Sequence, residues 1–375
     1  MVALRRCQDF LRRESLLVGF TLLAVVLEGI DPASWAQLAG WSRSPTLVGL
    51  LGLMLAIQGI RDSGLIPALA HRLIRGIPSR RGLGMALVLS SALASMLLTN
   101  DVSLFLLIPL SLTLAGPTGL PVWRLVSLEA LAVNAGSALS PIGNPQNLLL
   151  LQQSGLSLGR FSLGLLPSAL AMLTLVMVFS ACWLPGGRTP PVSSETAPGP
   201  IHRHMAGLSL LALAGMVLSL ASGHPGWGCG LILLATLLLA PRLAIRIDWL
   251  LLASFLAIFV ALGHAAALPP VHALLARLDL QQPLTLYLSG IVASQLISNV
   301  PAAVLLLSRH PDPTALAVAV NVGGFGFGIG SMANLIAWRI AGIKDGLGRF
   351  HKVSIPFLLV TAPIVYGLQR VWHPH

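Results

Sequence analysis

The residues of this chain best suited to binding a small ion are its asparagines, because all of them fall in four short motifs. They are Asn100, Asn134, Asn144, Asn147, Asn299, Asn321 and Asn334. An Asn amide offers donors and an acceptor without a fixed charge, and it is costly to leave without partners in hydrocarbon. The clustering predicts an ion-binding site. The alternative is that the amides cap half-helices and hold neighbouring spans together.

One acidic residue, Asp101, directly follows the pair Thr99–Asn100 and has apolar sequence on both sides. A carboxylate inside a span costs about 2.5–3.5 kcal/mol on insertion scales, so a functional role is the default expectation. Asp101 could bind Na⁺, carry a coupled proton, or cap the half-helix that follows it. The residues alone leave these three roles open.

The motifs form two copies of one arrangement. The stretch NAGSALSPIGNPQNL at 134–148 aligns without a gap with NVGGFGFGIGSMANL at 321–335, at an offset of 187 residues. Ahead of it, LLTNDVSLFLLIPL at 97–110 aligns with LISNVPAAVLLLSR at 296–309, which pairs Thr99–Asn100 with Ser298–Asn299. Two motifs in the same order in both halves indicate an internal duplication.

Glycines and prolines in these motifs are expected to break the helices that carry the amides. Glycine lets the chain unwind and lets a ligand approach the backbone, while Pro141, Pro145 and Pro301 stop a helix from continuing. The freed helix ends offer N–H groups to anions and C=O groups to cations. The glycines concerned are Gly136, Gly143, Gly323, Gly324 and Gly330. For the run 323–330 the alternative is close helix packing.

The elements that must position these residues are membrane-spanning helices. Of the 375 residues 55% are hydrophobic and 9% are charged, against roughly a quarter charged in soluble domains. Apolar stretches close to the span length of about 20 residues recur along the chain, and they do not alternate as the strands of a barrel would. The net charge of +11 reflects Arg and Lys beside spans rather than a nucleic-acid surface. We therefore predict an all-α polytopic membrane protein.

A Pro-, Gly- and Ser-rich stretch at 185–204 divides the chain into two similar halves. We expect a first inverted repeat at 1–184, a linker and connecting span at 185–225, and a second inverted repeat at 226–375. Single spans are expected at 16–30, 47–60, 161–184, 207–221, 228–240, 249–268 and 353–369. Re-entrant hairpins are expected at 83–115 and 284–308, and broken helices at 122–152 and 314–336, which gives about nine spans and two hairpins.

Charge placement orients these elements. With the N-terminus in the cytoplasm and both hairpins returning to their own side, eighteen of the 23 Arg and Lys residues fall on the cytoplasmic side. The same arrangement puts corresponding loops of the two halves on opposite sides, so the repeats are inverted. It predicts a multi-pass protein of the inner membrane with its C-terminus outside. Inverted repeats with broken helices are a transporter design.

The motifs TNDVSLFLLIP and NAGSALSPIGNPQN, repeated as SNVPAAVLLL and NVGGFGFGIGSMANL, resemble those of the ion transporter superfamily. This superfamily includes arsenite efflux permeases, Na⁺/H⁺ antiporters of the same fold and divalent anion:sodium symporters, and its members carry a citrate transporter-like domain. The resemblance covers about residues 15–370. It implies a homodimer that works by an elevator mechanism, with substrate and coupling ions at the hairpin tips and broken helices.

Carried over residue by residue, the resemblance maps the site onto Thr99, Asn100, Asn134, Gly136, Asn144, Asn147, Ser298, Asn299, Asn321, Gly323, Ser331 and Asn334. Our candidate set adds Asp101, Ser137, Gly143, Gly324 and Gly330. A coupling Na⁺ is expected near Asn100, Asp101, Asn134, Asn299 and Asn321. Dicarboxylate symporters carry Ser-Asn-Thr at both tips, whereas here the third positions are Asp101 and Val300. This departure resembles the arsenite and antiporter branches. It disfavours a di- or tricarboxylate, because Asp101 would repel such an anion and the four motifs quoted for the resemblance contain no Arg or Lys to balance it.

The expected function is therefore secondary active transport of an inorganic or small organic anion, coupled to H⁺ or Na⁺. The alternatives are an arsenite or antimonite efflux permease and a Na⁺/H⁺ antiporter. An intramembrane enzyme is a remote alternative, because no HExxH motif or pair of intramembrane aspartates occurs. We expect no cofactor. No GxxxxGK[ST] loop is present, although a separate ATPase subunit could associate with the chain.

Overall fold

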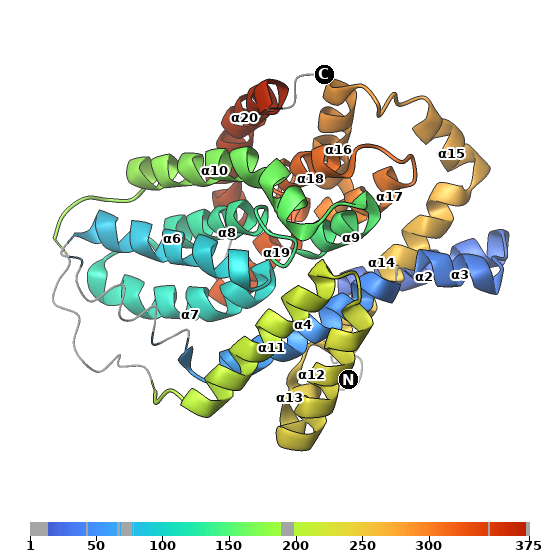
Figure 1. Ribbon diagram of the computed structural model, residues 1–375. Coiled ribbons are helices and arrows are strands. Elements are labelled where there is room, and N and C mark those ends of the chain that lie inside the picture. The colour runs from blue at the N-terminus through green and yellow to red at the C-terminus, as the bar shows by residue number, and fades with distance from the viewer. Residues whose placement is uncertain are drawn as a thin grey trace, which may run out of the picture.

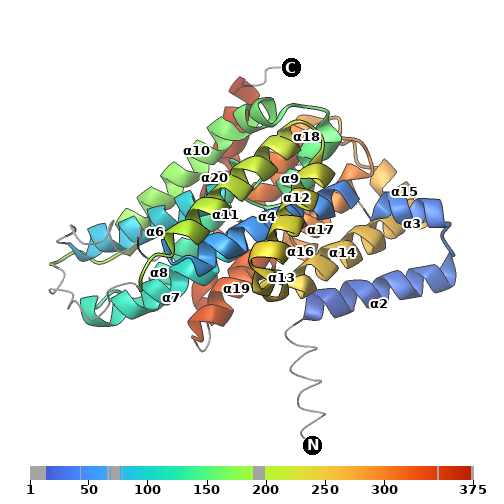
Figure 2. The same cartoon turned by 60° about the horizontal axis from the view of Figure 1, so that its bottom comes forward.

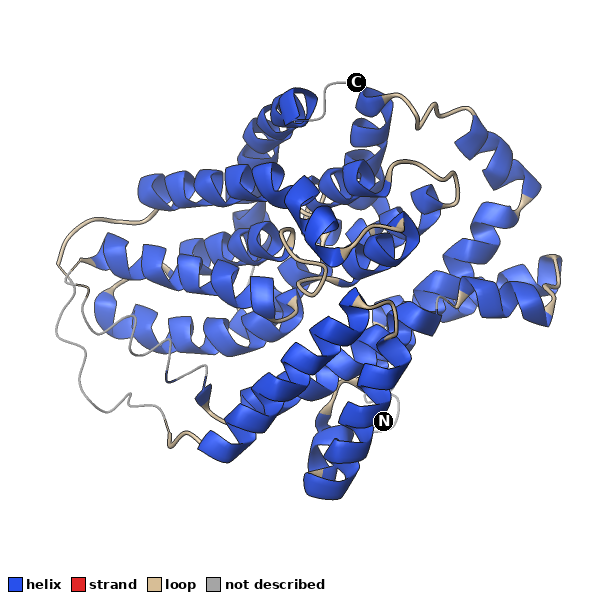
Figure 3. Ribbon diagram, in the orientation of Figure 1, coloured by secondary structure: helices blue, strands red, loops and turns tan. Residues whose placement is uncertain are grey.

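The computed structural model describes residues 14–42, 44–65, 68, 77, 79–188, 199–343 and 346–372. In these ranges the regular structure is α-helical, apart from one 3₁₀ turn at Gly328–Gly330 and an isolated bridge between Ser79 and Arg188 (Figure 3). The prediction of an all-helical fold is confirmed for this part of the chain. The basic N-terminal residues and positions 189–198 of the expected linker lie outside the described residues.

The helices of the first half carry the first copy of the motifs. They are α2 (Ser15–Ile30), α3 (Trp35–Trp41), α4 (Ser44–Asp62), α6 (Arg80–Leu97), α7 (Asn100–Thr118), α8 (Val122–Ser137), α9 (Pro145–Ser154) and α10 (Leu158–Trp183). The second half contains α11 (Arg203–Ala221), α12 (Pro225–Leu239), α13 (Pro241–Arg246), α14 (Trp249–Ala267), α15 (Pro269–Ala276), α16 (Pro283–Ile297), α17 (Asn299–Leu307), α18 (Pro313–Val322), α19 (Met332–Ala341) and α20 (Gly346–Trp372).

The two expected hairpins differ in length. The arms α6 and α7 of the first hairpin have 18 and 19 residues and extend beyond both ends of the expected 83–115. The caps set these limits. The Ser79 side chain starts α6 by accepting from Gly82 N, and α7 ends only where Gly119 adopts the left-handed conformation with φ 68°. The arm α17 has only nine residues.

Both expected broken helices are interrupted at the motifs. Helix α8 ends at Ser137, and α9 begins at Pro145 after the Asn144 side chain accepts from Asn147 N. In the second half α18 ends at Val322, and α19 begins after Ser331, whose hydroxyl accepts from Ala333 N. A polar N-cap starts both second segments, and α9 also has proline at its first helical position.

By length and composition, four of the described helices could each cross a membrane. They are α10, α11, α14 and α20, and the bent pair of α3 and α4 would make a fifth. Other apolar helices, among them α2, α12 and α16, are shorter than 18 residues. The chain is a multi-pass membrane protein, and the count of nine spans stays a prediction.

The helices pack into two groups (Figures 1 and 2). The site group comprises α6 to α10 and α16 to α20, and it contains all four motifs. The scaffold group comprises α2 to α4 and α11 to α15. Figure 2 shows α2, α3 and α14 at one side of the molecule and α6, α7 and α8 at the other. The main contacts between the groups are those of α14 with α17 and of α4 with α9.

Helix α8 lies at the centre of the site group. Its residues from Leu125 to Ser137 are buried without exception, and it packs against α6, α7, α10, α19 and α20. The first broken helix is therefore held on every side by helices of both halves, which fixes the position of the amide that it carries.

Candidate functional site

The two broken helices join through pairs of amides that cross from one half of the chain to the other. Asn134 of α8 donates from Nδ2 to Asn334 Oδ1 of α19 at 2.9 Å. Its own Oδ1 accepts from Ser331 Oγ at 2.9 Å. All three residues are buried, so the contact holds the end of α8 against the start of α19.

The same contacts recur with the halves exchanged. Asn321 of α18 donates from Nδ2 to Asn147 Oδ1 of α9 at 2.8 Å, and its Oδ1 accepts from Asn144 Nδ2 at 3.0 Å. Each of these residues is the partner, at the offset of 187, of one in the first set. We call the residues Asn134, Asn144, Asn147, Asn321, Ser331 and Asn334 the amide cluster. Five of the predicted Asn residues thus contact one another directly across the repeats.

Motif glycines permit the close packing around the amide cluster. A Cβ on Gly136 would lie 2.1 Å from the Ala92 carbonyl oxygen, and a Cβ on Gly323 would lie 2.6 Å from Ser294 Cβ. Gly143 and Gly330 are equally confined by backbone atoms. Gly324 has more room, since a Cβ there would meet Asn321 O at 3.1 Å. Packing against α6 and α16 therefore accounts for Gly136 and Gly323, in line with the packing alternative.

The first hairpin tip meets the first broken helix through the backbone. Asn100 N donates to Gly143 O at 2.9 Å, which ties the first tip to the first broken helix. The Asn100 and Asn299 side chains each accept from the following backbone N–H at 2.9 Å. Ser298 has φ 75°, which is strained for a residue with a side chain, and its buried hydroxyl has no partner. Backbone strain combined with a buried polar group that has no hydrogen-bond partner is typical of ligand-binding sites.

Asp101 is buried, and one of its carboxylate oxygens has no hydrogen-bond partner. Its side chain is 6% exposed and its Oδ1 has no hydrogen-bond partner. Thr99 is the N-cap of α7, with its hydroxyl accepting from Val102 N, so the cap role that the sequence left open for Asp101 belongs to Thr99. The carboxylate still lies in the first turn, where the helix dipole favours a negative charge.

Asp101 lines a cavity of about 280 Å³ between the two groups of helices. We call it the Asp101 pocket, and its walls come from α4, α7, α9 and the segment from α13 to α14. Its polar and charged lining residues are Gln58, Arg61, Thr99, Asp101, Arg246 and Asp248. Of the predicted site residues, Thr99 and Asp101 reach this cavity, and the amide cluster lies behind them.

Sequence reasoning missed several residues of the site. Arg61, Arg246 and Asp248 lie far from the motifs in the sequence, and only the packing of the scaffold group against hairpin α6–α7 brings them to Asp101. Gln146 had a usable signal, because it lies between Asn144 and Asn147 in the motif. Its Nε2 donates to Asn321 Oδ1 at 3.3 Å, and its buried Oε1 has no partner.

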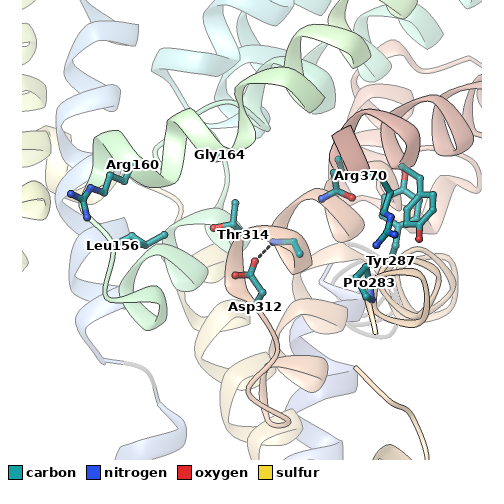
Figure 4. Close-up of a pocket in the computed structure, with 11 residues that line it drawn as sticks. Leu156, Arg160, Gly164, Pro283, Tyr287, Asp312, Thr314 and Arg370 are labelled. Atoms are coloured by element: carbon teal, nitrogen blue, oxygen red, sulfur yellow. Dashed lines mark hydrogen bonds between the residues drawn. The ribbon is translucent and has the colours of Figure 1, made fainter. Parts of the chain in front are cut away.

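A second cavity of about 280 Å³ lies elsewhere, between α10, α16, α18 and α20. Figure 4 shows Arg160 at one end, Tyr287 and Arg370 at the other, and Asp312 between them, with its carboxylate accepting from the Ala315 N–H. None of the predicted site residues lines it. It is therefore separate from the motif site.

No group of three or more His, Cys, Asp or Glu side chains that could hold a metal ion occurs among the residues that the structure describes. Any cation bound near the motifs would rely on Asp101, amide oxygens and backbone carbonyls. Oxygen ligands of this kind suit a hard, weakly held cation such as Na⁺.

The fold and the site together define a multi-pass membrane transport protein. The chain matches the Citrate transporter family over residues 10–310 and belongs to that family. It is 38% identical to the inner membrane protein YbiR of Escherichia coli, over 93% of this chain and 94% of that protein. It is 34% identical to the silicon efflux transporter LSI3 of Oryza sativa, over 41% of this chain and 32% of that protein.

A solved structure supports the fold. The YdaH transporter of Alcanivorax borkumensis aligns with a TM-score of 0.54 at 17% identity, over 96% of this chain and 98% of that one. At this identity the likeness concerns the arrangement of helices alone.

Proposed function

We propose that this chain is a secondary active transporter of a small anion, inorganic or organic, coupled to H⁺ or Na⁺ through Asp101. The observation that carries the proposal is the unpartnered Oδ1 of a buried carboxylate that lines a cavity beside the amide cluster. A carboxylate oxygen in that position is costly unless a cation or a proton completes its contacts.

The arrangement of the two groups supports an elevator-type movement. On the second half, α14 of the scaffold group packs closely on α17 of the second hairpin. On the first half, the Asp101 pocket separates α4 from much of α7. One hairpin is thus sealed against the scaffold group while the other borders an open cavity. Movement of the site group along the scaffold group would open the second hairpin to a cavity and seal the first hairpin against the scaffold group.

The proposed orientation places the open side in the cytoplasm. Arg61 and Arg246 line the Asp101 pocket, and both belong to the cytoplasmic set of positive charges. The N-terminus is then cytoplasmic and the C-terminus outside.

The second candidate is efflux of a neutral or weakly acidic oxyacid such as arsenite or antimonite, or Na⁺/H⁺ antiport. It is favoured by the Asn-Asp pair at the first tip and by the printed names of two relatives, the silicon efflux transporter LSI3 and a putative transporter arsB of Dictyostelium discoideum. The Dictyostelium protein is 25% identical over 40% of this chain.

Flux measurements on the purified full chain in proteoliposomes test these proposals. Imposed Na⁺ and H⁺ gradients are combined in turn with citrate, phosphate, formate and arsenite. Gradient-driven accumulation of an anion supports the first proposal. Transport of arsenite alone, or Na⁺/H⁺ exchange without any added substrate, would replace it with the second candidate.

A further inference from the structure

The Asp101 pocket contains one positive charge that forms no ion pair within the described part of the chain. Arg246 Nη1 lies 2.6 Å from Asp62 Oδ2, so this arginine is already paired. Arg61 is exposed at the pocket, and it makes no ion pair with any carboxylate among the residues that the structure describes. The pocket also contains the carboxylates of Asp101 and Asp248.

Arg61 is held in place by an aromatic ring. Its Cζ lies 5.5 Å from the centre of the Phe105 ring, on the next turn of α7 after Asp101. A guanidinium that stacks on a ring keeps its N–H donors available in the plane of the group. The contact therefore fixes the charge of Arg61 at the pocket without using its donors.

The remaining charges limit what Arg61 could bind. Asp248 Oδ1 accepts from Leu251 N at 2.9 Å and so starts α14, but its negative charge remains in the pocket. The attraction to Arg61 and the repulsion from Asp101 and Asp248 both scale with the charge of the ligand, so with two carboxylates against one guanidinium the net repulsion grows as that charge rises. A ligand with a single negative charge meets the weaker repulsion.

We propose that Arg61 binds the anion that enters the Asp101 pocket, and that the ligand class is a small anion with a single negative charge. This rests on the proposed function only in treating the pocket as the route to the motif site. The juxtaposition of Arg61, Phe105 and the free oxygen of Asp101 would place anion and cation side by side between the scaffold and site groups.

A thiol-labelling experiment tests the role of Arg61 without requiring transport. Met54 lines the same pocket on α4, and it is replaced by cysteine in the full chain after Cys7, Cys182 and Cys229 are changed to serine. Its rate of modification is measured with two methanethiosulfonates, the negatively charged sulfonatoethyl reagent and the positively charged trimethylammonioethyl reagent. The ratio of the two rates reports the charge that a small ion meets in the pocket.

The variants are Arg61→Gln, Arg61→Lys and Arg277→Gln, the last an exposed arginine at the end of α15 that does not line the pocket. In Arg61→Gln we expect the anionic reagent to react roughly three- to eightfold more slowly and the cationic one faster, because one charge is lost at close range. Arg61→Lys should stay within about twofold of the parent. An equal effect of Arg277→Gln, or no effect of Arg61→Gln, would overturn the role of Arg61.

Competition distinguishes the ligand class. Formate and oxalate are added at equal ionic strength during labelling with the anionic reagent, and formate should protect Met54→Cys more strongly. Stronger protection by oxalate would overturn the single-charge assignment, and protection by neither would overturn the anion site. Because labelling needs no flux, a failed gradient-driven assay with normal labelling counts against coupling through Asp101 and leaves the anion site standing.

Discussion

Neighbouring side chains at the start of α7 do different things with their oxygens. Asn100 Oδ1 accepts the backbone N–H of Asp101, and the Thr99 hydroxyl accepts that of Val102, so both complete the start of the helix. Asp101 Oδ1 takes part in no such contact. The helix explains the first two side chains, and the unpartnered oxygen of the third is the reason that we propose a ligand there.

Removal of the charge at Asp101 should uncouple transport. In Asp101→Asn, gradient-driven uptake should fall at least about tenfold, because the amide cannot release a proton and binds a cation far more weakly, while substrate exchange persists. Uptake and exchange are measured in the same proteoliposomes.

The matched control is Asp312→Asn, an exposed aspartate that caps α18 through Ala315 N. Asn is an equally good cap, so transport by that variant should be nearly normal. Normal gradient-driven flux in Asp101→Asn would exclude Asp101 as the coupling residue.

The amide cluster should show strong coupling between Asn321 and Asn147, which are 2.8 Å apart at their polar atoms. Each single change to Ala should lower the free energy of unfolding by about 1–3 kcal/mol, because buried partners are left unpaired. The double variant should be less damaging than the sum by about 0.5–3 kcal/mol. Denaturation of the purified protein in detergent measures this.

The control is a second double-mutant cycle, which combines Thr46→Val with Asn321→Ala. Thr46 lies on α4 and donates to Gln152 Oε1, away from the cluster, so its effect should add to that of Asn321→Ala. Additivity between Asn321→Ala and Asn147→Ala would contradict the paired contact.

At the scale of the element, the packing of α8 on α6 depends on a glycine, Gly136. The Cβ of an alanine at position 136 would lie 2.1 Å from Ala92 O, and backbone cannot move aside as a flexible side chain can. The close approach also keeps Asn134, two residues earlier, within reach of α19. One glycine therefore links helix packing to the geometry of the site.

Gly136→Ala should lower stability by about 1–3 kcal/mol or more, the usual cost of overpacking. Gly116→Ala on α7 is the control, because nothing lies within 4 Å of its new Cβ, and its effect should stay below about 1 kcal/mol. Thermal unfolding in detergent compares the two variants. Equal unfolding temperatures of Gly136→Ala and Gly116→Ala would show that α6 and α8 can move apart at this point to admit the added methyl group.

Much of this architecture could be predicted because its causes are local. Pro145 and the polar caps that restart α9 and α19 are visible in the sequence, and so is the duplication that relates them. The lengths of the hairpin arms were less accessible, because Ser79 and Gly119 set the limits of α6 and α7 outside the apolar runs. Which amide pairs with which depends on how two broken helices cross, and the contribution of Arg61 depends on how two groups of helices pack. Neither leaves a pattern along the chain.

At the scale of the whole molecule, the two groups of helices divide the work. On α11 and α12 of the scaffold group, apolar residues such as Leu211 and Leu238 are exposed, which suits contact with lipid. The site group buries the residues of the amide cluster. Contacts between the groups are confined mainly to α14 on α17 and α4 on α9, which suits relative movement.

Cysteine labelling should locate the two sides of the membrane. In a background without native cysteines, Gly348→Cys should react with a membrane-impermeant thiol reagent only from the cytoplasm, and Gly159→Cys only from outside. Both glycines are exposed and have no atom within 4 Å of an added Cβ, so the changes should be tolerated. Permeabilised cells, where both should react, provide the control. Labelling of both from one side would contradict the inverted orientation.

The reciprocal amide pairs also bear on how such a chain can evolve. Every pair joins one half of the chain to the other, as Asn134 joins Asn334 and Asn321 joins Asn147. Within each half some amide oxygens have no partner, because Asn147 Oδ1 accepts from Asn321 and Asn334 Oδ1 accepts from Asn134. Two fragments divided between 188 and 199 would therefore have to be made together in one membrane. A substitution in one motif is felt at once by its partner in the other copy. Selection therefore acts on the copies jointly, although equivalent contact positions can still differ between them, as Asn144 and Ser331 do.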